Sequence, residues 1–237
     1  MTSAPATQPI GPSIDPHPAK RPERVTLKGR WITLAPLDPQ AHAKALYEGS
    51  NGDATREAVW TYLFDGPYTS LDEFRANIEA KARSADPLFF TVIDNSSGRA
   101  VGYQTLMRID AANRVIEVGN VMYTPAMQRT AGATEAQYLF AKHVFEELGD
   151  RRYEWKCHAL NAPSRRAAER FGFTFEGIFR QHMIVKGRNR DTAWFAMLDS
   201  EWPARKAAYE RWLAPDNFNA EGRQKLKLSD LMPKGNG

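Results

Sequence analysis

The stretch Met127–Glu135, Met-Gln-Arg-Thr-Ala-Gly-Ala-Thr-Glu, joins a run typical of a strand to a run typical of a helix. Its three small residues, 131 to 133, would let another molecule approach the backbone closely. The first turn of a helix also leaves several backbone NH groups without partners. The stretch therefore predicts an anion-binding turn, and tight packing of strand against helix is the alternative explanation for the small residues.

Composition limits the classes of protein to consider. Hydrophobic residues make up 42% and charged residues 25% of the 237 positions, which is ordinary for a globular chain. The single cysteine, Cys157, excludes an intramolecular disulfide framework and a cysteine-rich zinc site and suits a reducing compartment, so we expect a cytoplasmic protein without a metal. A formal net charge of +4 is small for a nucleic-acid-binding surface, and no run is apolar enough for a signal peptide or a membrane span. We expect neither nucleic acid nor membrane as a partner, and a monomer or a homodimer.

The chain is predicted to consist of three parts. Residues 1–24 are rich in proline and predict a disordered arm. Residues 25–200 carry the strand and helix patterns of one domain. Residues 201–237 predict a helical appendage, through Trp202 and Trp212, followed by a polar tail.

Before the central turn, the spacing of apolar residues changes from helical to alternating. Ser70, followed by Glu73 three residues later, predicts a capping box that opens a helix. The turn sequence 95–98, Asn-Ser-Ser-Gly, predicts a hairpin, and a third alternating run completes a three-stranded meander. The other predicted elements are strands at Trp31–Leu37, Leu88–Asp94, Arg99–Arg108 and Arg114–Tyr123, short helices at Ala41–Glu48 and Asp53–Trp60, and an aromatic loop at Tyr62–Tyr68.

After the turn, a helix with one apolar stripe is predicted to end at Gly149. His143 lies on that stripe, and we expect a histidine at the edge of the core with a backbone partner rather than a catalytic one. Arg152–His158 alternates, and because a helix precedes it, its pairing with the meander should be parallel. The remaining predicted elements are a helix capped by Asn161 that ends near Gly172 and a hairpin of Phe173–Val185 with Asp191–Leu198.

This order of elements resembles the GNAT superfamily of acyl-CoA-dependent N-acetyltransferases. The motifs 134–136 (Thr-Glu-Ala), 161–164 (Asn-Ala-Pro-Ser) and 171–173 (Phe-Gly-Phe) resemble, in that order, the RimJ/RimL-like branch related to ribosomal-protein N-terminal alanine acetyltransferases. The resemblance covers Leu27 to Leu198. It implies an α+β fold with a central twisted mixed sheet of about seven strands flanked by helices.

The same resemblance implies a reaction. Acetyl-CoA would be the acyl donor, and a primary amine, either a protein N-terminus or a small molecule, would attack it directly in a ternary complex. An acyl-CoA-binding regulatory module without turnover is the alternative, because the signature of the family is imperfect here.

The signature of the family at the turn is Gln or Arg, two residues, Gly, one residue, then Gly or Ala. One alignment places Gln128, Ala131 and Ala133 at these positions, and another places Arg129, Gly132 and Thr134 there. We therefore expect contacts to acetyl-CoA from both sets, from the end of the preceding strand and from the next helix. The complete predicted set is Met122, Tyr123, Gln128, Arg129, Ala131, Gly132, Ala133, Thr134, Asn161 and Ser164.

The candidate general base is Glu117, because it is the one acidic residue inside the third meander strand and the resemblance places that strand beside the acceptor. Its alternative role is an ion pair with Arg108 or Arg114. Partial burial would raise the pKa of its carboxyl toward the operating pH.

The proton donor to the leaving thiolate has two candidates in the sequence. Many relatives carry a tyrosine seven residues after the capping asparagine, a position held here by Ala168. Ser164 and Tyr123 are the candidate donors. Their alternative roles are to satisfy an NH group at a helix start and to pack at a strand end.

Two further groups of residues have open roles. Four arginines could bind cofactor phosphates or remain solvated, namely Arg129, Arg165, Arg166 and Arg170. The aromatic loop, with Trp60, Tyr62, Phe64 and Tyr68, could line the acceptor pocket or belong to the core.

Overall fold

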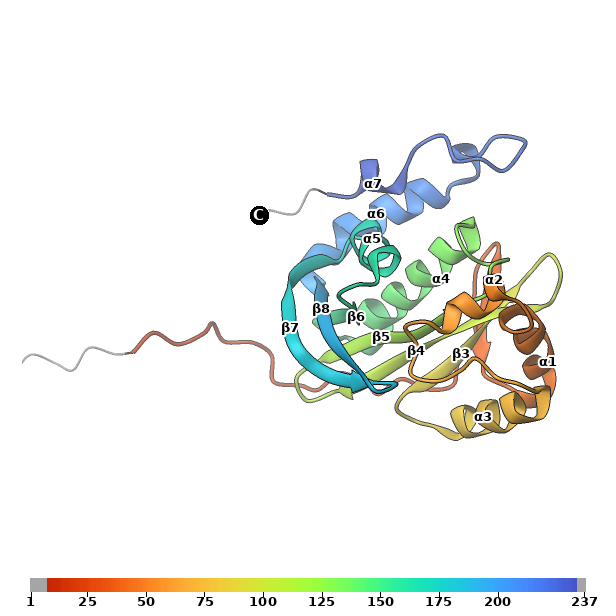
Figure 1. Ribbon diagram of the computed structural model, residues 1–237. Coiled ribbons are helices and arrows are strands. Elements are labelled where there is room, and N and C mark those ends of the chain that lie inside the picture. The colour runs from red at the N-terminus through yellow and green to blue at the C-terminus, as the bar shows by residue number, and fades with distance from the viewer. Residues whose placement is uncertain (1–7, 234–237) are drawn as a thin grey trace, which may run out of the picture.

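The computed structural model describes residues 8–233, which form one sheet with helices on both faces (Figure 1). The strands are β1 (Leu27–Lys28), β2 (Ile32–Pro36), β3 (Leu88–Asp94), β4 (Ala100–Asp110), β5 (Val115–Tyr123), β6 (Arg152–His158), β7 (Thr174–Val185) and β8 (Arg188–Leu198). They are ordered β1-β2-β3-β4-β5-β6-β8-β7, and β5 with β6 is the parallel pair. The predicted mixed sheet is confirmed, with β1 as an eighth strand. Two residues are too few to show an alternating pattern in a sequence.

The helices begin and end close to the predicted positions. They are α1 (Pro39–Ser50), α2 (Ala54–Glu57), η1 (Ala58–Trp60), α3 (Leu71–Arg83), α4 (Ala131–Lys142), the π-helical η2 (His143–Leu148), α5 (Ala162–Arg170), η3 (Asp199–Glu201), α6 (Trp202–Leu213), η4 (Pro215–Asn217) and α7 (Leu228–Leu231). Ser70 caps α3 as predicted, because its hydroxyl oxygen accepts from the NH of Glu73. The Glu73 carboxylate, however, accepts from the NH of Thr69, one residue before the cap.

The sheet carries a separate apolar core on each face, and β3 contributes to both. Phe89 packs with side chains of α1 and α3, including Leu46 and Phe74. Phe90, which points the opposite way, packs edge to face on Phe140 of α4. In Figure 1, α1 and α3 accordingly lie on the other side of the sheet from α4.

The parallel pairing of β5 with β6 is short. It extends only from Val115 opposite Arg152 to Val118 opposite Trp155. Just beyond it, β5 contains a bulge at Asn120, whose φ of 46° lies in the left-handed region. A bulge bends a strand and redirects its side chains. The two central strands therefore separate at the middle of the sheet.

One buried carboxylate joins α4 to the first hairpin. Glu135, 5% exposed, accepts from the backbone NH groups of Arg30, Trp31 and Ile32 at 2.7, 2.7 and 3.0 Å. A Cβ atom on Gly29 would collide with the same carboxylate, so the turn before β2 is shaped around it. The start of α4 and the edge of the sheet are thus held as one unit.

The segment before β1 and the helix α6 after β8 both contact the rest of the fold. The NH groups of Ala19 and Lys20 donate to carbonyl oxygens at Ala111 and Leu148, while the segment before Ala19 extends away from the sheet (Figure 1). Helix α6 packs on α4, and the hydroxyl of Tyr209 donates to the Phe171 carbonyl. The boundaries at residues 24 and 200 stay predictions, and residues 1–7 and 234–237 lie outside the described residues. No helix between residues 8 and 233 is both long and apolar enough to cross a membrane.

Asp150 introduces a pH dependence of stability. It is 4% exposed, its Oδ2 atom has no hydrogen-bond partner among the described residues, and burial raises its pKa to about 7 from 3.8. Because the pKa is higher in the folded chain, the stability contributed by the protonated carboxyl is complete below about pH 4 and is lost as pH rises through about 7. Asp150→Asn should keep this stability at every pH. Its free energy of unfolding should exceed that of the native protein by about 1–2 kcal/mol at pH 8 but not at pH 4.5. Urea unfolding of both proteins at the two pH values measures this; an equal difference at both would contradict it.

Candidate active site

A cavity of about 90 Å³ lies where β5 and β6 separate. Its walls come from the aromatic loop, the middle of β4 and β5, the end of β6, the start of α5 and one residue of β8. The lining residues are Tyr62, Leu63, Phe64, Met107, Arg108, Glu117, Val118, Gly119, Asn120, Val121, Trp155, Lys156, Cys157, His158, Asn161, Ser164 and Arg190. Of the predicted site residues, Glu117, Asn161 and Ser164 therefore meet in one cavity.

Glu117 is the buried carboxylate of this cavity, with 4% of its surface exposed. Its Oε2 atom accepts from Arg108 Nη1 at 3.2 Å and from Lys156 Nζ at 2.9 Å. Among the described residues its Oε1 atom has no hydrogen-bond partner. Burial raises the pKa of Glu117 above its usual range, although Lys156 and Arg108 oppose this shift. The carboxyl forms the ion pair with Arg108 that was predicted as its alternative role. Its Oε1 atom is also a potential proton acceptor.

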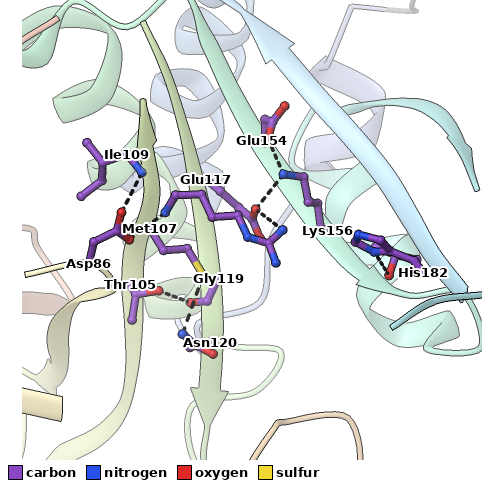
Figure 2. A network of polar contacts seen from close by, with 12 residues as sticks. Asp86, Thr105, Met107, Ile109, Glu117, Gly119, Asn120, Glu154, Lys156 and His182 are labelled. Carbon is purple, nitrogen blue, oxygen red and sulfur yellow. Dashed lines mark hydrogen bonds and ion pairs between the residues drawn. The ribbon is translucent and has the colours of Figure 1, made fainter. Parts of the chain in front are cut away.

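The ammonium of Lys156 sits between two carboxylates. Figure 2 shows Lys156 and Glu117 directed toward each other from adjacent strands, with Glu154 on the other side of the ammonium. Lys156 Nζ lies 2.6 Å from Glu154 Oε2 and 3.8 Å from the centroid of the Trp194 ring. Glu154 also accepts from Arg152 Nε at 2.6 Å. A chain of alternating charges thus runs from the cavity along β6, which fixes the position of the Glu117 carboxylate.

The start of α5 forms the opposite wall. The Asn161 side chain caps the helix by accepting from the NH of Ser164 at 3.1 Å. The Ser164 hydroxyl oxygen accepts from the indole NH of Trp155 at 3.1 Å, and the hydroxyl also interacts with the neighbouring thiol of Cys157. Ala168, one turn later, is fully buried in the core, so it offers the cavity no hydroxyl group.

Tyr123 does not border the cavity. Its hydroxyl donates to the side-chain oxygen of Gln104 and accepts from Gln137 Nε2 at 2.8 Å. Burial raises the pKa of this phenol well above its usual value. Met122 beside it is fully buried in the core that faces α1 and α3. Of the two predicted donors, only Ser164 reaches the space beside Glu117.

The first turn of α4 retains free backbone donors. Thr130 caps the helix by accepting from the NH of Ala133 at 3.2 Å. Among residues 8–233, the NH groups of Arg129, Ala131 and Gly132 have no hydrogen-bond acceptor. A Cβ on Gly132 would lie 2.7 Å from Ile32, so the small size of this glycine serves packing against β2. Such a turn fits an anion, and the glycine explains how α4 can approach the sheet closely.

The side chains of Gln128 and Thr134, which the sequence also placed at this turn, have partners within the chain. Gln128 Nε2 donates to the Tyr123 carbonyl oxygen. Thr134 is buried, and its hydroxyl accepts from Arg170 Nη1 at 3.0 Å. Arg165 lies over the ring of Phe175, and Arg129 and Arg166 are exposed. Arg129 is the arginine closest in sequence to the free NH groups.

The aromatic loop divides between the two roles predicted for it. Trp60 and Tyr68 are buried and pack edge to face on Phe74 in the core, whereas Tyr62 and Phe64 border the cavity. The tip of the β7–β8 hairpin closes over this loop. The exposed Lys186 donates through Nζ to the carbonyl oxygens at 60, 65 and 66, at 3.0, 2.9 and 3.0 Å.

A larger cavity of about 310 Å³ lies on the other side of the loop, between the loop and α3. Its charged groups, Lys81 and Asp65, form an ion pair with each other, and Lys81 Nζ also contacts the Tyr103 hydroxyl at 3.1 Å. It shares Leu63, Phe64 and Asn120 with the smaller cavity. The predicted catalytic residues Glu117 and Ser164 border the smaller cavity and not the larger one.

His143 lies away from both cavities. It is buried in η2, and burial lowers its pKa. Its position at the core agrees with the expectation of a non-catalytic histidine, but its Nε2 atom has no hydrogen-bond partner among the described residues.

Arg108 was predicted only as a possible ion-pair partner, and two further charged residues of the cavity, Lys156 and Arg190, were not predicted at all. Lys156 alternates with Glu154 and His158 on β6, and this run of polar residues on an inner strand was an available signal. Arg190 borders the cavity from β8 and is 7% exposed. Nothing in its local sequence distinguishes it from Arg188, two residues earlier.

The profile of the acetyltransferase (GNAT) domain matches residues 32–174. The structure is similar to that of a GCN5-related N-acetyltransferase from Brucella melitensis, which is 54% identical, with a TM-score of 0.88 and coverage of 91% of this chain and 97% of that one.

Two further relatives are more distant. A Chromobacterium violaceum structure, provisionally described as a GNAT-family acetyltransferase, is 39% identical, with a TM-score of 0.75, and covers 84% of this chain and 100% of its own. A Bacillus subtilis (strain 168) protein, YdaF, is 27% identical over 177 residues, 74% of this chain and 95% of that one; its name places it provisionally among ribosomal N-acetyltransferases.

Proposed function

Because the chain belongs to the GNAT acetyltransferase family, as its sequence predicted, we propose that it transfers the acetyl group of acetyl-CoA to a primary amine by direct attack. The observation that carries the proposal is Glu117, a buried carboxyl with one free oxygen in the cavity where β5 and β6 separate. The name of the Bacillus subtilis relative supports the RimJ/RimL-like branch.

The residues present fit acetyl-CoA. The free NH groups at Arg129, Ala131 and Gly132 can donate hydrogen bonds to the pyrophosphate, since a helix start favours an anion there. Asn161 and Ser164 lie at the cavity, where the pantetheine end would reach. When bound, the cofactor supplies an activated acyl group. The proposed binding set also keeps the predicted residues that shape the end of β5 and the turn around the cofactor. They are Met122, Tyr123, Gln128, Ala133 and Thr134.

Side chains of this protein would accept and donate the protons of the reaction. The amine must be neutral when it attacks, and Oε1 of Glu117 can take its proton directly or through a water. Lys156 and Arg108 hold the other oxygen, so the free one keeps its direction toward the cavity. The Ser164 hydroxyl is the proposed proton donor to the leaving thiolate, because it borders the cavity that holds Glu117, whereas the Tyr123 hydroxyl does not.

Binding without turnover is the second candidate, and the observation that favours it is the absence of a hydroxyl group at Ala168. One experiment separates the two. Acetyl-CoA should raise the thermal unfolding temperature, and a panel of primary amines should release free thiol from it. Stabilisation without acceptor-dependent thiol release on any amine would favour the binding module, and the lack of any stabilisation would exclude both.

Lys156→Met should move the acidic limb of the pH profile of kcat/KM to higher pH. The ammonium of Lys156 lowers the pKa of Glu117, so its removal lets burial raise that pKa further, and less of the base is ionised at neutral pH. The limiting rate at high pH should change little. Initial rates from pH 5.5 to 10 measure the shift, with Arg108→Gln as the comparison, because Arg108 is 39% exposed and should affect the limb less. A limb that stays in place or moves to lower pH would contradict the role given to Glu117.

A further inference from the structure

Arg190 is a buried cation without a carboxylate partner. Its guanidinium lies over the ring of Phe64 at 5.2 Å, and its Nε donates to the Thr192 hydroxyl at 3.3 Å. Among residues 8–233, no carboxylate oxygen lies within 4.0 Å of it, and neither Nη group has a hydrogen-bond acceptor. Four of its five NH donors are therefore uncommitted.

The neighbouring cations differ in this respect. Arg108 and Lys156 share the carboxylates of Glu117 and Glu154, so their charges are compensated. His182, whose imidazole contacts Thr192, has a pKa lowered by burial and by Arg108, Arg190 and Lys156. Glu117 attracts the Arg190 guanidinium from a distance but forms no ion pair with it. A buried guanidinium is unfavourable unless a carboxylate or another anion contacts it directly. The cavity wall thus has an excess positive charge at Arg190.

The strand register places Arg190 on the acceptor side. Thr192 lies opposite His158, and Trp194 lies opposite Lys156, so the alternate residues of β8 share the face that carries Glu117. Helix α4, with its free NH groups, packs on the other face. Arg190 is therefore separated by the sheet from the proposed site of the cofactor phosphates, and the anion it lacks belongs to the acceptor.

The geometry points to an acceptor that carries a carboxylate as well as its primary amine. The two Nη groups of Arg190 bind the carboxylate, in the forked arrangement that guanidinium favours, and Phe64 covers the pair. Glu117 meanwhile takes the proton of the amine. This inference rests on the proposed acetyl transfer, and it excludes polyamines and other purely cationic amines as the preferred acceptors.

The test compares acceptors that differ only in the anion. Glycine and phenylalanine are paired with their amides, the peptide amide Ala-Asp-Ala with Ala-Asn-Ala, and spermidine serves as the cationic acceptor. Thiol release from acetyl-CoA gives kcat and KM for each. The native protein should prefer the carboxylate member of at least one pair by about tenfold or more in kcat/KM, because a charge-assisted bidentate contact is lost in the amide. The free amino acids and the acidic peptide show which source of carboxylate is used.

Three variants assign the preference to this residue. Arg190→Gln should raise KM for the carboxylate acceptor by about ten- to a hundredfold and leave its amide nearly unchanged. Arg190→Lys should restore part of the preference for the carboxylate acceptor. Arg188 is an exposed arginine two residues earlier on β8, and Arg188→Gln should change the KM of neither the acid nor its amide.

The outcomes separate the two proposals. Equal use of acid and amide, a preference for spermidine, or an equal loss on both members in Arg190→Gln overturns the inference and leaves acetyl transfer intact. No thiol release on any amine removes the proposed function and the inference with it. If the variants do not fold, the acid-to-amide ratio of the native protein decides.

Discussion

Glu117→Gln should lower kcat by about 100- to 10,000-fold while the affinity for acetyl-CoA stays the same. General base catalysis contributes on this order, and glutamine keeps the shape of the side chain but cannot take a proton. Because burial raises the pKa of Glu117, the native kcat/KM should increase with pH across a range above that of an ordinary carboxyl. The variant should lose this limb.

Two measurements make the result specific. Thermal stabilisation by acetyl-CoA should be equal in Glu117→Gln and the native protein, since the free NH groups of α4 lie on the other face of the sheet. Glu169→Gln, an exposed carboxyl on α5, is the matched control and should keep the native rate and profile. A Glu117→Gln protein with native kcat and an unchanged acidic limb would remove this residue as the base.

Glu135→Ala should destabilise the folded chain by about 3 kcal/mol or more. Its carboxylate satisfies three backbone NH groups between β1 and β2, and hydrogen bonds to a charged acceptor contribute about 1.5–3 kcal/mol each, although not additively. Without it, these donors are left unpaired beside a cavity. Glu135→Gln should lose a large part of the same stability, because an amide nitrogen would face NH groups.

Urea unfolding followed by tryptophan fluorescence gives the free energies, with Glu221→Ala as a control at an exposed glutamate in the segment after α6. Hydrogen exchange gives a second readout. The NH groups of Trp31 and Ile32 should exchange faster in Glu135→Ala even under native conditions. A loss below about 0.5 kcal/mol would show that water or a shift of the turn replaces the carboxylate.

Most of the elements could be predicted because their signals are local. The caps at Ser70 and Asn161, the turn at 95–98 and the alternation of the strands each depend on residues a few positions apart. The parallel placement of β6 followed from one intervening helix. Glu117 was singled out for the same reason, as an acidic residue inside an alternating run.

The rest of the site depends on contacts between residues distant in sequence. The position of Lys156 next to Glu117 follows from the register of β5 against β6, and that of Arg190 from the further pairing of β8. A sequence without known register cannot show which charges share a cavity. Likewise, the motif at 134–136 was recognised as a family feature, but the partners of Glu135 lie more than a hundred residues earlier.

The contact of Lys186 with the aromatic loop bears on how the acceptor preference could diverge among relatives. The ammonium binds three backbone carbonyl oxygens and no side chain of the loop. Substitutions at Leu63 or Phe64 would therefore leave the attachment of the hairpin intact while they change the surface that the cavity presents. The loop can therefore accumulate mutations in the side chains that face the cavity while the β7–β8 hairpin stays attached to its backbone. This makes the loop a favourable region for directed evolution toward new amines.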